Sequence, residues 1–180
     1  FPYTTLFRSA LYQYGGVYMD TDVEVLKSFN PLLEAQCILG MEEKEYVATS
    51  FMAFEKGHPL VKEFLNLYEQ LSFLDKKGQI IAGTNVAKLT KMLKEKGFVQ
   101  ENHYQELENG IQIYPKEFFS PYDYINCHYN ITENSYCVHY FAVSWMSKKE
   151  QVKKEIKKRI VKILGPEKMN GIREKLWKKN

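Results

Sequence analysis

The sequence predicts an α/β fold, because segments with strand periodicity alternate along the chain with segments of helical periodicity. Its 180 residues are 44% hydrophobic and 26% charged, which is the balance of one ordinary globular domain with a core of its own. Phe, Tyr and Trp make up 14% of the residues, and this aromatic content excludes disorder as the main state. No run of about 18 apolar residues occurs, so we expect no membrane-spanning segment.

The chain opens with a helical pattern that Gly15-Gly16 brings to an end. The apolar side chains expected on one face of this helix are Leu6, Ala10, Leu11 and Tyr14. From Val17 to Val25, apolar residues alternate with Tyr18, Asp20, Asp22 and Glu24. This spacing predicts one continuous strand with its acidic side chains opposite its valines, and we expect that strand near the centre of a sheet.

Further strands and helices follow in order. Strands are expected at residues 36–41, 46–54, 111–114 and 136–140. A helix begins at Gly57-His58-Pro59, since proline suits the first helical turn. A second helix runs from Asn85, a favourable N-cap residue, to Gly97, a favourable residue just after a helix. Near the end of the chain, Gly165-Pro166 separates a longer basic helix from a short one.

The net charge of +3 hides a strong asymmetry along the chain. Residues 147–180 hold 13 Lys/Arg and 4 Asp/Glu, whereas residues 1–146 hold 12 Lys/Arg and 18 Asp/Glu. We therefore divide the chain into an acidic body, residues 1–146, and a basic helical tail, residues 147–180. Lysines and Arg159 surround an apolar stripe from Val152 to Leu164, which is typical of a basic amphipathic helix. Such a helix either packs its stripe on the body or attaches to an anionic membrane surface, where Trp177 would suit the headgroup level.

The cysteines and the start of the chain indicate a reducing compartment. Cys37, Cys127 and Cys137 are odd in number and include no Cys-x-x-Cys pair, so neither a disulfide framework nor a thiolate zinc site is expected. No basic and apolar leader opens the chain, and we therefore expect no export by a signal peptide. The predicted location is cytoplasmic, with peripheral attachment of the tail to the inner face of a membrane.

The segment most informative about function is Gly-Gly-Val-Tyr-Met-Asp-Thr-Asp at residues 15–22. Asp20 and Asp22 are two residues apart, and on a strand their side chains would project to the same side, about 6–7 Å apart at the backbone. At the end of a strand, two such carboxylates form an oxygen-rich site for a divalent cation and, through it, a diphosphate. A solvated strand face carries the same pattern, so the pair alone leaves both interpretations open.

Leu11 to Glu24 closely resembles the DxD region of sugar-nucleotide-dependent glycosyltransferases. The family is that of bacterial capsular-polysaccharide transferases and yeast-type initiating mannosyltransferases. Further segments resemble family motifs in the same order: Phe54 to Pro59, Ala82-Gly83-Thr84 with Leu89-Thr90, Ile113 to Pro115, and Tyr136 to Tyr140 followed by Ser144-Trp145. The resemblance covers residues 10–146, and it implies a GT-A-like nucleotide-sugar transferase fold.

The resemblance implies a retaining, metal-dependent transfer of a sugar from a nucleoside-diphosphate sugar to a hydroxyl of a glycan or lipid-linked acceptor. The process would be the synthesis of capsular or cell-surface polysaccharide. Asp20 and Asp22 are the implied catalytic residues, and with His139 they are the implied ligands of Mn²⁺ or Mg²⁺. We expect Asp22 and His139 within about 12 Å of each other, because each would lie ~2.0–2.6 Å from a shared ion. The implied nucleotide-sugar contacts are Gly15, Gly16, Tyr18, Ser144 and Trp145.

Two departures from the family pattern limit what the chain is expected to do alone. Only 19 residues precede Asp20, fewer than one βαβ unit of about 30 residues, so we expect part of the first half of the fold to be missing. The Asp and Arg by which the family holds the donor sugar would fall at Thr4 and Phe7, and Arg8 is turned by roughly 100° around the helix. We therefore expect residues 1–9 to be foreign to the parent gene, and the chain alone to transfer little or no sugar.

Two other interpretations stay open. A haloacid-dehalogenase-type phosphohydrolase also uses Asp-x-Asp after a strand, with the first Asp as nucleophile, but that family usually has Gly-Thr after the pair, where this chain has Val23-Glu24. A non-catalytic fragment that binds a membrane or a protein partner would fit the missing half. A nucleic-acid partner is not expected, because the body is acidic and no nucleic-acid-binding motif is present.

Overall fold

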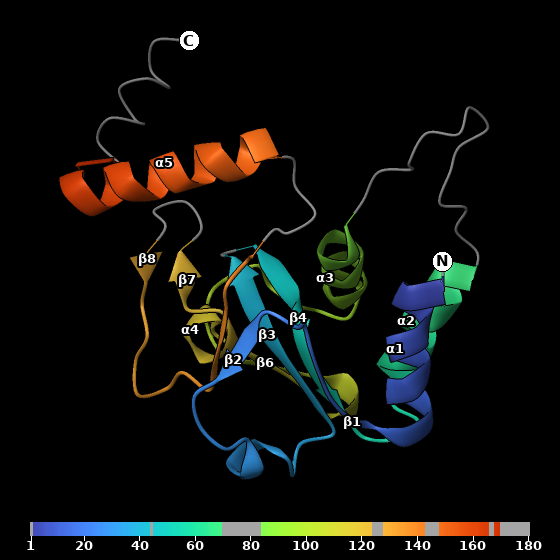
Figure 1. Ribbon diagram of the computed structural model, residues 1–180. Coiled ribbons are helices and arrows are strands. Elements are labelled where there is room, and N and C mark those ends of the chain that lie inside the picture. The colour runs from blue at the N-terminus through green and yellow to red at the C-terminus, as the bar shows by residue number, and fades with distance from the viewer. Residues whose placement is uncertain are drawn as a thin grey trace.

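The computed structural model of the chain describes residues 2–43, 45–69, 84–123, 128–142, 148–165 and 168–169. Its helices are α1 (Pro2–Tyr14), α2 (Pro59–Glu69), α3 (Asn85–Glu95), α4 (Lys116–Phe119) and α5 (Lys148–Leu164), with short 3-10 turns at Asn30–Leu32 and Glu108–Gly110. Its strands are β1 (Gly16–Met19), β2 (Val23–Val25), β3 (Cys37–Glu43), β4 (Tyr46–Phe54), β5 (Gln105–Leu107), β6 (Ile111–Tyr114), β7 (Tyr122–Asp123), β8 (His128–Tyr129) and β9 (Cys137–His139). The alternation of strands and helices confirms the predicted α/β class (Figure 1).

The main sheet has five strands in the order β1-β4-β3-β6-β5. β4 pairs antiparallel with both β1 and β3, and β5 pairs antiparallel with β6. β3 and β6 run parallel, with Cys37 opposite Ile111. The chain between them contains α2 and α3, since parallel neighbours require a long crossover connection. This mixed sheet is consistent with the GT-A-like fold that the family resemblance implies.

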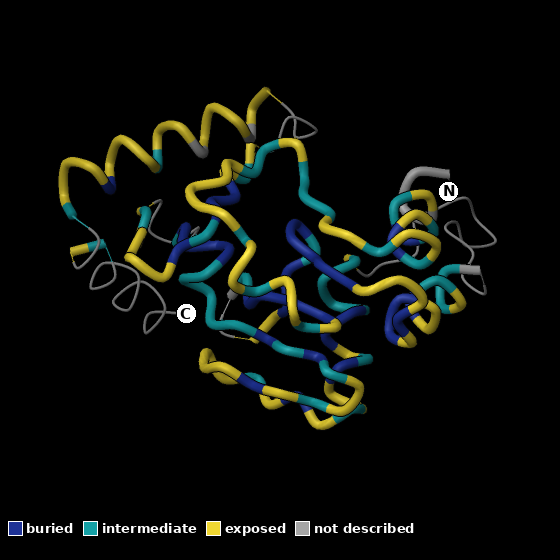
Figure 2. Tube along the Cα trace, turned by 90° about the horizontal axis from the view of Figure 1, so that it is seen from below, coloured by how far each residue is buried: buried dark blue, intermediate teal, exposed yellow. Residues whose placement is uncertain are grey.

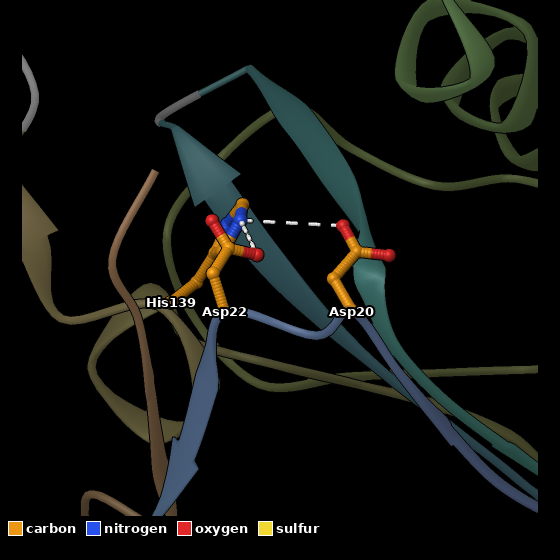
Figure 3. Close-up of side chains that lie close together, drawn as sticks. All are labelled: Asp20, Asp22 and His139. Atoms are coloured by element: carbon orange, nitrogen blue, oxygen red, sulfur yellow. Dashed lines mark ion pairs between the residues drawn. The ribbon is translucent and has the colours of Figure 1, made fainter. Parts of the chain in front are cut away.

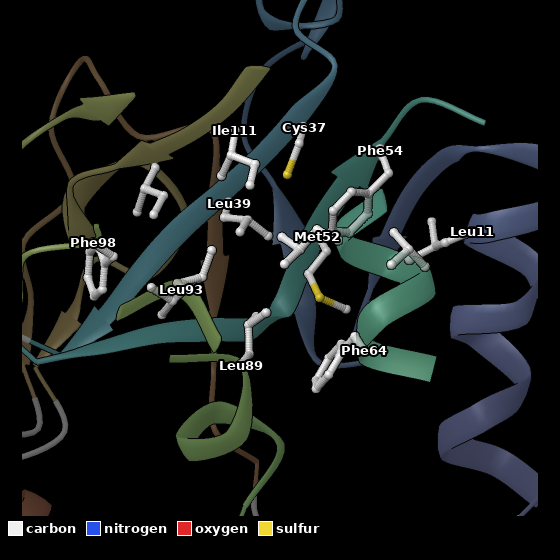
Figure 4. Close-up of a cluster of buried hydrophobic side chains, with 14 of the residues drawn as sticks. Leu11, Cys37, Leu39, Met52, Phe54, Phe64, Leu89, Leu93, Phe98 and Ile111 are labelled. Carbon is white, nitrogen blue, oxygen red and sulfur yellow. The ribbon is translucent and has the colours of Figure 1, made fainter. Parts of the chain in front are cut away.

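Two groups of buried side chains pack on opposite faces of this sheet, and Figure 2 shows the buried residues concentrated in its central strands. The larger group joins the sheet to α1, α2 and α3, and it includes Leu11 and Leu89 (Figure 4). On the other face, Phe51 of β4 stacks on Phe119 of α4 with ring centroids 4.0 Å apart, and Cys137 of β9 belongs to the same group. Each large apolar side chain buried in this way stabilises the fold by ~1.5–3 kcal/mol.

One charged side chain, Arg8 of α1, is fully buried between α1 and α2. Its guanidinium carbon lies 4.1 Å from the ring centroids of both Phe64 and Tyr68, and 4.6 Å from that of Phe7. Burial lowers the pKa of Arg8 to about 10, against the opposing interaction with Tyr68. The three rings hold the buried guanidinium by cation–π contact. Phe7 and Arg8 therefore pack into the body of the fold, and the foreign origin of residues 1–9 stays a prediction.

The helix expected at the start of the chain is confirmed as α1, and of its expected apolar face Leu11 is confirmed, whereas Leu6, Ala10 and Tyr14 are exposed. Leu6 and Tyr14 are 64% and 79% exposed, while Arg8 and Leu11 face the core. A hydrophobic pattern does not count arginine as a core residue, whereas the aromatic rings around Arg8 and its interaction with Tyr68 make its burial tolerable here. The hydrophobic pattern of the sequence therefore could not predict which side of α1 faces the core.

The helices at residues 59–69 and 85–95 are also confirmed, with one correction at the start of α3. The N-cap residue is Thr84, not Asn85, because the Thr84 hydroxyl accepts a hydrogen bond from the backbone N–H of Ala87 at 3.2 Å. Asn85 is instead the first helical residue, and its side chain accepts a hydrogen bond from the Tyr68 hydroxyl. The expected end of this helix at Gly97 is confirmed by the φ of that residue, +97°.

The single strand expected from Val17 to Val25 is wrong, because this segment forms two strands that belong to two different sheets. Between β1 and β2 the chain turns. The Asp20 N–H donates to the Ser50 carbonyl at 2.9 Å, and the Val23 N–H donates to the Asp20 carbonyl at 3.1 Å. The alternating pattern hid this turn, since Asp and Thr suit turns as well as exposed strand positions. β1 is also at the edge of the described sheet rather than near its centre, with β4 as its hydrogen-bonded neighbour.

The long basic helix of the tail is confirmed as α5, which ends where Gly165 takes a φ of +80°. None of the helices in the described part of the chain combines the length and the apolar character that a membrane crossing requires. Cys37 and Cys137 are buried thiols without a disulfide, and burial raises the pKa of both. Cys127 and Trp177 lie outside the described residues, and the division into body and tail stays a prediction.

We expect Gly15→Ala to destabilise the fold more than Gly97→Ala, although both glycines have a positive φ, +69° and +97°. A Cβ on Gly15 would lie 2.7 Å from the backbone nitrogen of Lys56 and 2.9 Å from the carbonyl oxygen of Phe54, whereas a Cβ on Gly97 would meet no atom within 4 Å. Both variants carry the ~1–2 kcal/mol penalty of a left-handed residue, but only Gly15→Ala adds a clash with backbone. Urea denaturation should show an extra loss of at least about 1 kcal/mol for Gly15→Ala. Equal losses would contradict the close approach of the α1–β1 turn to the β4–α2 connection.

Candidate metal centre

The candidate site lies in the turn between β1 and β2 and on β9, the strand that pairs with β2. Asp20 and Asp22 belong to the turn, and the antiparallel register places Val23 opposite His139. The Nε2 atom of His139 is 3.2 Å from Oδ1 of Asp22 and 4.0 Å from Oδ2 of Asp20 (Figure 3). The structure thus brings together the three residues that the resemblance implies as metal ligands, well inside the expected distance.

These three side chains form a partly open cluster at the wall of a pocket. One potential ligand atom from each lies within 4.8 Å of the others. The side chain of His139 is 11% exposed, against 26% for Asp22 and 38% for Asp20. The pocket has a volume of about 510 Å³, which is within the range of small-molecule sites. The two carboxylates therefore face a pocket as expected, but from a turn rather than from the end of a long strand.

Each carboxylate has one oxygen held by a hydrogen bond and the other directed toward His139. The Tyr18 hydroxyl donates to Oδ1 of Asp20 at 2.7 Å, and Oδ2 is the oxygen that faces Nε2. The backbone N–H of Ala142 donates to Oδ2 of Asp22 at 2.8 Å, and Oδ1 is the oxygen 3.2 Å from the same Nε2. The fold therefore turns one oxygen of each carboxylate toward a common point beside the imidazole.

Aromatic contacts fix two side chains of the site, Tyr18 and His139. The Tyr18 ring stacks on Phe7 of α1 with centroids 4.2 Å apart, and the His139 ring lies 4.0 Å from the ring of Phe141. Burial and the hydrogen bond to Asp20 raise the pKa of Tyr18 well above its usual value, so its hydroxyl stays protonated and can donate. Phe141 has a φ of +49°, a strained conformation outside glycine, and the residue after it supplies the N–H that holds Asp22.

The residues predicted to contact the nucleotide sugar divide into three groups. Tyr18 lines the pocket, whereas Gly15 and Gly16 are not among the described residues that do so. Gly15 instead ends α1 and lets the backbone after β4 pass close by. Ser144 and Trp145 lie outside the described residues, so their contacts, like those of the two glycines, stay predictions.

The family resemblance assigns the donor-sugar arginine to the position of Phe7, and this assignment stays a prediction. In the structure the Phe7 ring stacks on Tyr18. Arg8 packs against rings of α2 and is not among the described residues that line the pocket. This placement agrees with the expectation that Arg8 is turned away, and nothing is described of the Thr4 side chain.

Sequence reasoning missed the wall of the pocket that β3, β4 and α3 form with Glu42, Thr49, Ser50 and Val86. A signal was available for two of them, because Thr49-Ser50 is a polar pair inside an otherwise apolar strand. The Ser50 hydroxyl is buried and has no hydrogen-bond partner in the part of the chain that the structure describes. Since buried polar groups are nearly always satisfied, this buried hydroxyl without a partner marks Ser50 as a further residue of interest beside the acidic turn.

Comparison with known proteins finds similarity to glycosyltransferases. Residues 6–39 match a family model described as a glycosyltransferase sugar-binding region containing DXD motif. An uncharacterized protein of Arabidopsis thaliana is 34% identical over 123 residues, which cover 66% of this chain and 18% of that protein. Lactosylceramide 4-alpha-galactosyltransferase of Mus musculus is 30% identical over 116 residues, which cover 64% of this chain and 30% of that protein. Inositol phosphoceramide mannosyltransferase 3 of Schizosaccharomyces pombe is 30% identical over 63 residues, which cover 35% of this chain and 18% of that protein.

The chain spans less than a third of the length of each of these relatives. No solved structure matches it. The segment matched by the family model contains Asp20-Thr21-Asp22, the acidic turn of the candidate metal centre. The match and the relatives confirm the resemblance found in the sequence: residues 6–39 of this chain carry the DXD-containing sugar-binding region of glycosyltransferases.

Proposed function

We propose that this chain acts in the transfer of a sugar from a nucleoside-diphosphate sugar to a hydroxyl acceptor, with retention at the anomeric carbon. The observation that carries the proposal is the cluster of Asp20, Asp22 and His139 at the wall of a pocket. Both carboxylates of that cluster belong to the segment that matches a glycosyltransferase sugar-binding region. Retention is proposed from the family resemblance.

The cluster fits a divalent cation, for which we propose Mn²⁺ or Mg²⁺. Carboxylate oxygens suit both ions, while the imidazole nitrogen favours Mn²⁺ over Mg²⁺, whose usual ligands are oxygens. The ligand atoms would be Oδ2 of Asp20, Oδ1 of Asp22 and Nε2 of His139, because Tyr18 and Ala142 hold the two other oxygens. When bound, the cation neutralises charge on the diphosphate that leaves.

The chain's own groups complete the proposed donor site. Tyr18 and the Ala142 N–H hold the two carboxylates in place, so these groups need little reorganisation when a donor binds. Ser50 lines the same pocket, and its carbonyl accepts a hydrogen bond from the Asp20 N–H, which fixes the acidic turn beside β4. Arg8 is not among the described residues that line the pocket, which supports the expectation that this chain alone transfers little or no sugar.

For the acceptor we propose the hydroxyl of a glycan or of a lipid-linked head group. The names of two relatives, lactosylceramide 4-alpha-galactosyltransferase and inositol phosphoceramide mannosyltransferase 3, designate ceramide-linked acceptors for those proteins. These names support a lipid-linked acceptor for this chain as well. Synthesis of a capsular or cell-surface polysaccharide is the process proposed from the family resemblance.

A nucleotide-sugar-binding chain without transferase activity is the second candidate. The specific observation in its favour is the pair Phe7 and Arg8, which leaves the pocket without the family's donor-sugar arginine. A haloacid-dehalogenase-type hydrolase is less well supported, because both the family model and the relatives with an assigned activity are glycosyltransferases. Because this chain alone is expected to transfer little or no sugar, the assay that separates the first two candidates is sugar transfer by the longer parent protein, measured with saturating donor and Mn²⁺.

Calorimetric titration with uridine and guanosine diphosphate sugars tests the proposed function. We expect at least one of these donors to bind in the presence of Mn²⁺ and to lose at least about tenfold in affinity in EDTA or in Asp22→Asn, since the cation would bridge protein and diphosphate. Glu24→Gln is the matched control, because Glu24 lies two residues further along the chain but does not line the pocket. Donor binding that is equally tight in EDTA, or absent under all conditions, would contradict the proposal.

Tyr18→Phe should weaken Mn²⁺ binding by about 10- to 100-fold, which is the usual effect of losing a group that orients a metal ligand. The variant keeps the ring that stacks on Phe7 and loses only the hydroxyl that donates to Asp20. Tyr114→Phe is the control, because the Tyr114 hydroxyl donates to Gln112 at 2.9 Å, away from the site. Titration of both variants with Mn²⁺, followed by electron paramagnetic resonance, measures the effect. Equal affinities would mean that Tyr18 does not orient Asp20 for a cation.

A further inference from the structure

α5 carries an apolar stripe that faces solvent, and Figure 2 shows most of the described helix exposed. The side chains of Val152, Ile156, Ile160 and Ile163 are 57%, 53%, 41% and 81% exposed. Their spacing of four, four and three residues places them on one side of the helix. Singly scattered apolar side chains on a surface are normal, but four on one helix face mark an interaction surface.

This apolar stripe, defined by the four residues above, lies on the opposite side of α5 from its buried position. Val161 is the buried residue among the described side chains of α5, with 5% of its surface exposed. It lies nine residues from Val152, and at 100° per residue the two point to opposite sides of the helix. The helix therefore has a buried position at Val161 and, on the opposite side, an apolar stripe that stays exposed.

The charge of α5 decides which partner fits the stripe. The helix holds eight Lys/Arg and two Glu, a net charge of +6. The described basic side chains that are exposed are Lys148, Lys149, Lys153, Lys158, Arg159 and Lys162. A second copy would bring the same charge against itself, and a nucleic acid would leave the aliphatic side chains in water. An anionic bilayer accepts both, since its head groups attract the cations and its acyl boundary accepts the aliphatic groups.

We propose that α5 docks in the plane of an anionic lipid bilayer, with the apolar stripe below the head groups and the basic side chains at their level. The helix begins six residues after Ala142, whose N–H holds Asp22. Even a fully extended chain of this length spans only about 20 Å. Docking of α5 therefore keeps the candidate metal centre close to the lipid surface, where a lipid-linked acceptor would present its hydroxyl.

Flotation of the full chain with vesicles tests this proposal, and EDTA in every sample makes the result independent of the proposed sugar transfer. We expect binding to vesicles of phosphatidylglycerol and phosphatidylcholine, and little binding to phosphatidylcholine alone. Binding should weaken as salt rises, because the screening length falls to ~3 Å at 1 M. Equal binding to both kinds of vesicle, or none to either, would overturn the proposal.

Removal of the stripe separates membrane docking from simple charge attraction. Ile156→Ser combined with Ile160→Ser should lower the partition into anionic vesicles by at least about tenfold, because each aliphatic side chain gains from leaving water. Leu33→Ser combined with Ile131→Ser is the matched control, since these side chains are 51% and 53% exposed outside α5. All four positions are exposed, so neither double variant should unfold the chain. Unchanged partition of the stripe variant would overturn the proposal.

Removal of positive charge from α5 is the second test of the proposal by mutation. Lys153→Gln combined with Lys162→Gln should lower the partition by about 25-fold, since each cation near an anionic surface contributes about fivefold. If the chain instead binds RNA but not vesicles, the basic side chains serve a nucleic acid and the proposal is wrong. If it forms a dimer that the stripe variant abolishes, without binding vesicles, the stripe is an interface between copies and the proposal is equally wrong.

Discussion

The antiparallel pairing of β2 with β9 is the interaction on which the candidate metal centre depends. It places Val23 opposite His139, and so brings an imidazole from late in the chain to the acidic turn after β1. A two-stranded sheet of three residues each is marginal by itself, and two further contacts secure it. The Leu26 N–H donates to the Tyr136 carbonyl at 2.8 Å, and fully buried Cys137 packs in the core group beside Phe119, to whose carbonyl its thiol donates. The geometry of the site is thus anchored in the core beneath the main sheet.

The same pairing concentrates negative charge at one point, which gives the site its chemical character. Two carboxylates that share a site repel each other, and here each is held by a hydrogen bond that prevents it from turning away, from Tyr18 and from Ala142. One oxygen of each therefore stays directed toward the imidazole. A dication at that point would offset the repulsion, which supports the metal site proposed for these residues.

The sequence predicted the class of fold and the three clustered residues, and it failed where tertiary contacts override local pattern. The strands predicted at residues 36–41 and 46–54, which form β3 (Cys37–Glu43) and β4 (Tyr46–Phe54), were recognisable because most of their residues are apolar. The turn at Asp20 was missed, because alternation of acids and valines is equally compatible with a continuous strand. The strand is interrupted by the hydrogen bond from the Asp20 N–H to the Ser50 carbonyl and by the pairing of β2 with β9. The burial of Arg8 was missed, since it depends on rings of α2 that no local pattern connects to α1. His139 could be named only through the family resemblance, because a lone histidine on a strand carries no signal of its own.

Anomalous diffraction from crystals that contain Mn²⁺ and a nucleoside diphosphate tests most directly whether Asp20, Asp22 and His139 bind one ion. We expect a single strong peak at ~2.0–2.6 Å from Oδ2 of Asp20, Oδ1 of Asp22 and Nε2 of His139, with the diphosphate in contact with the same ion. A peak elsewhere, or no peak at a saturating concentration of Mn²⁺, would contradict the assignment of these three residues as a metal centre.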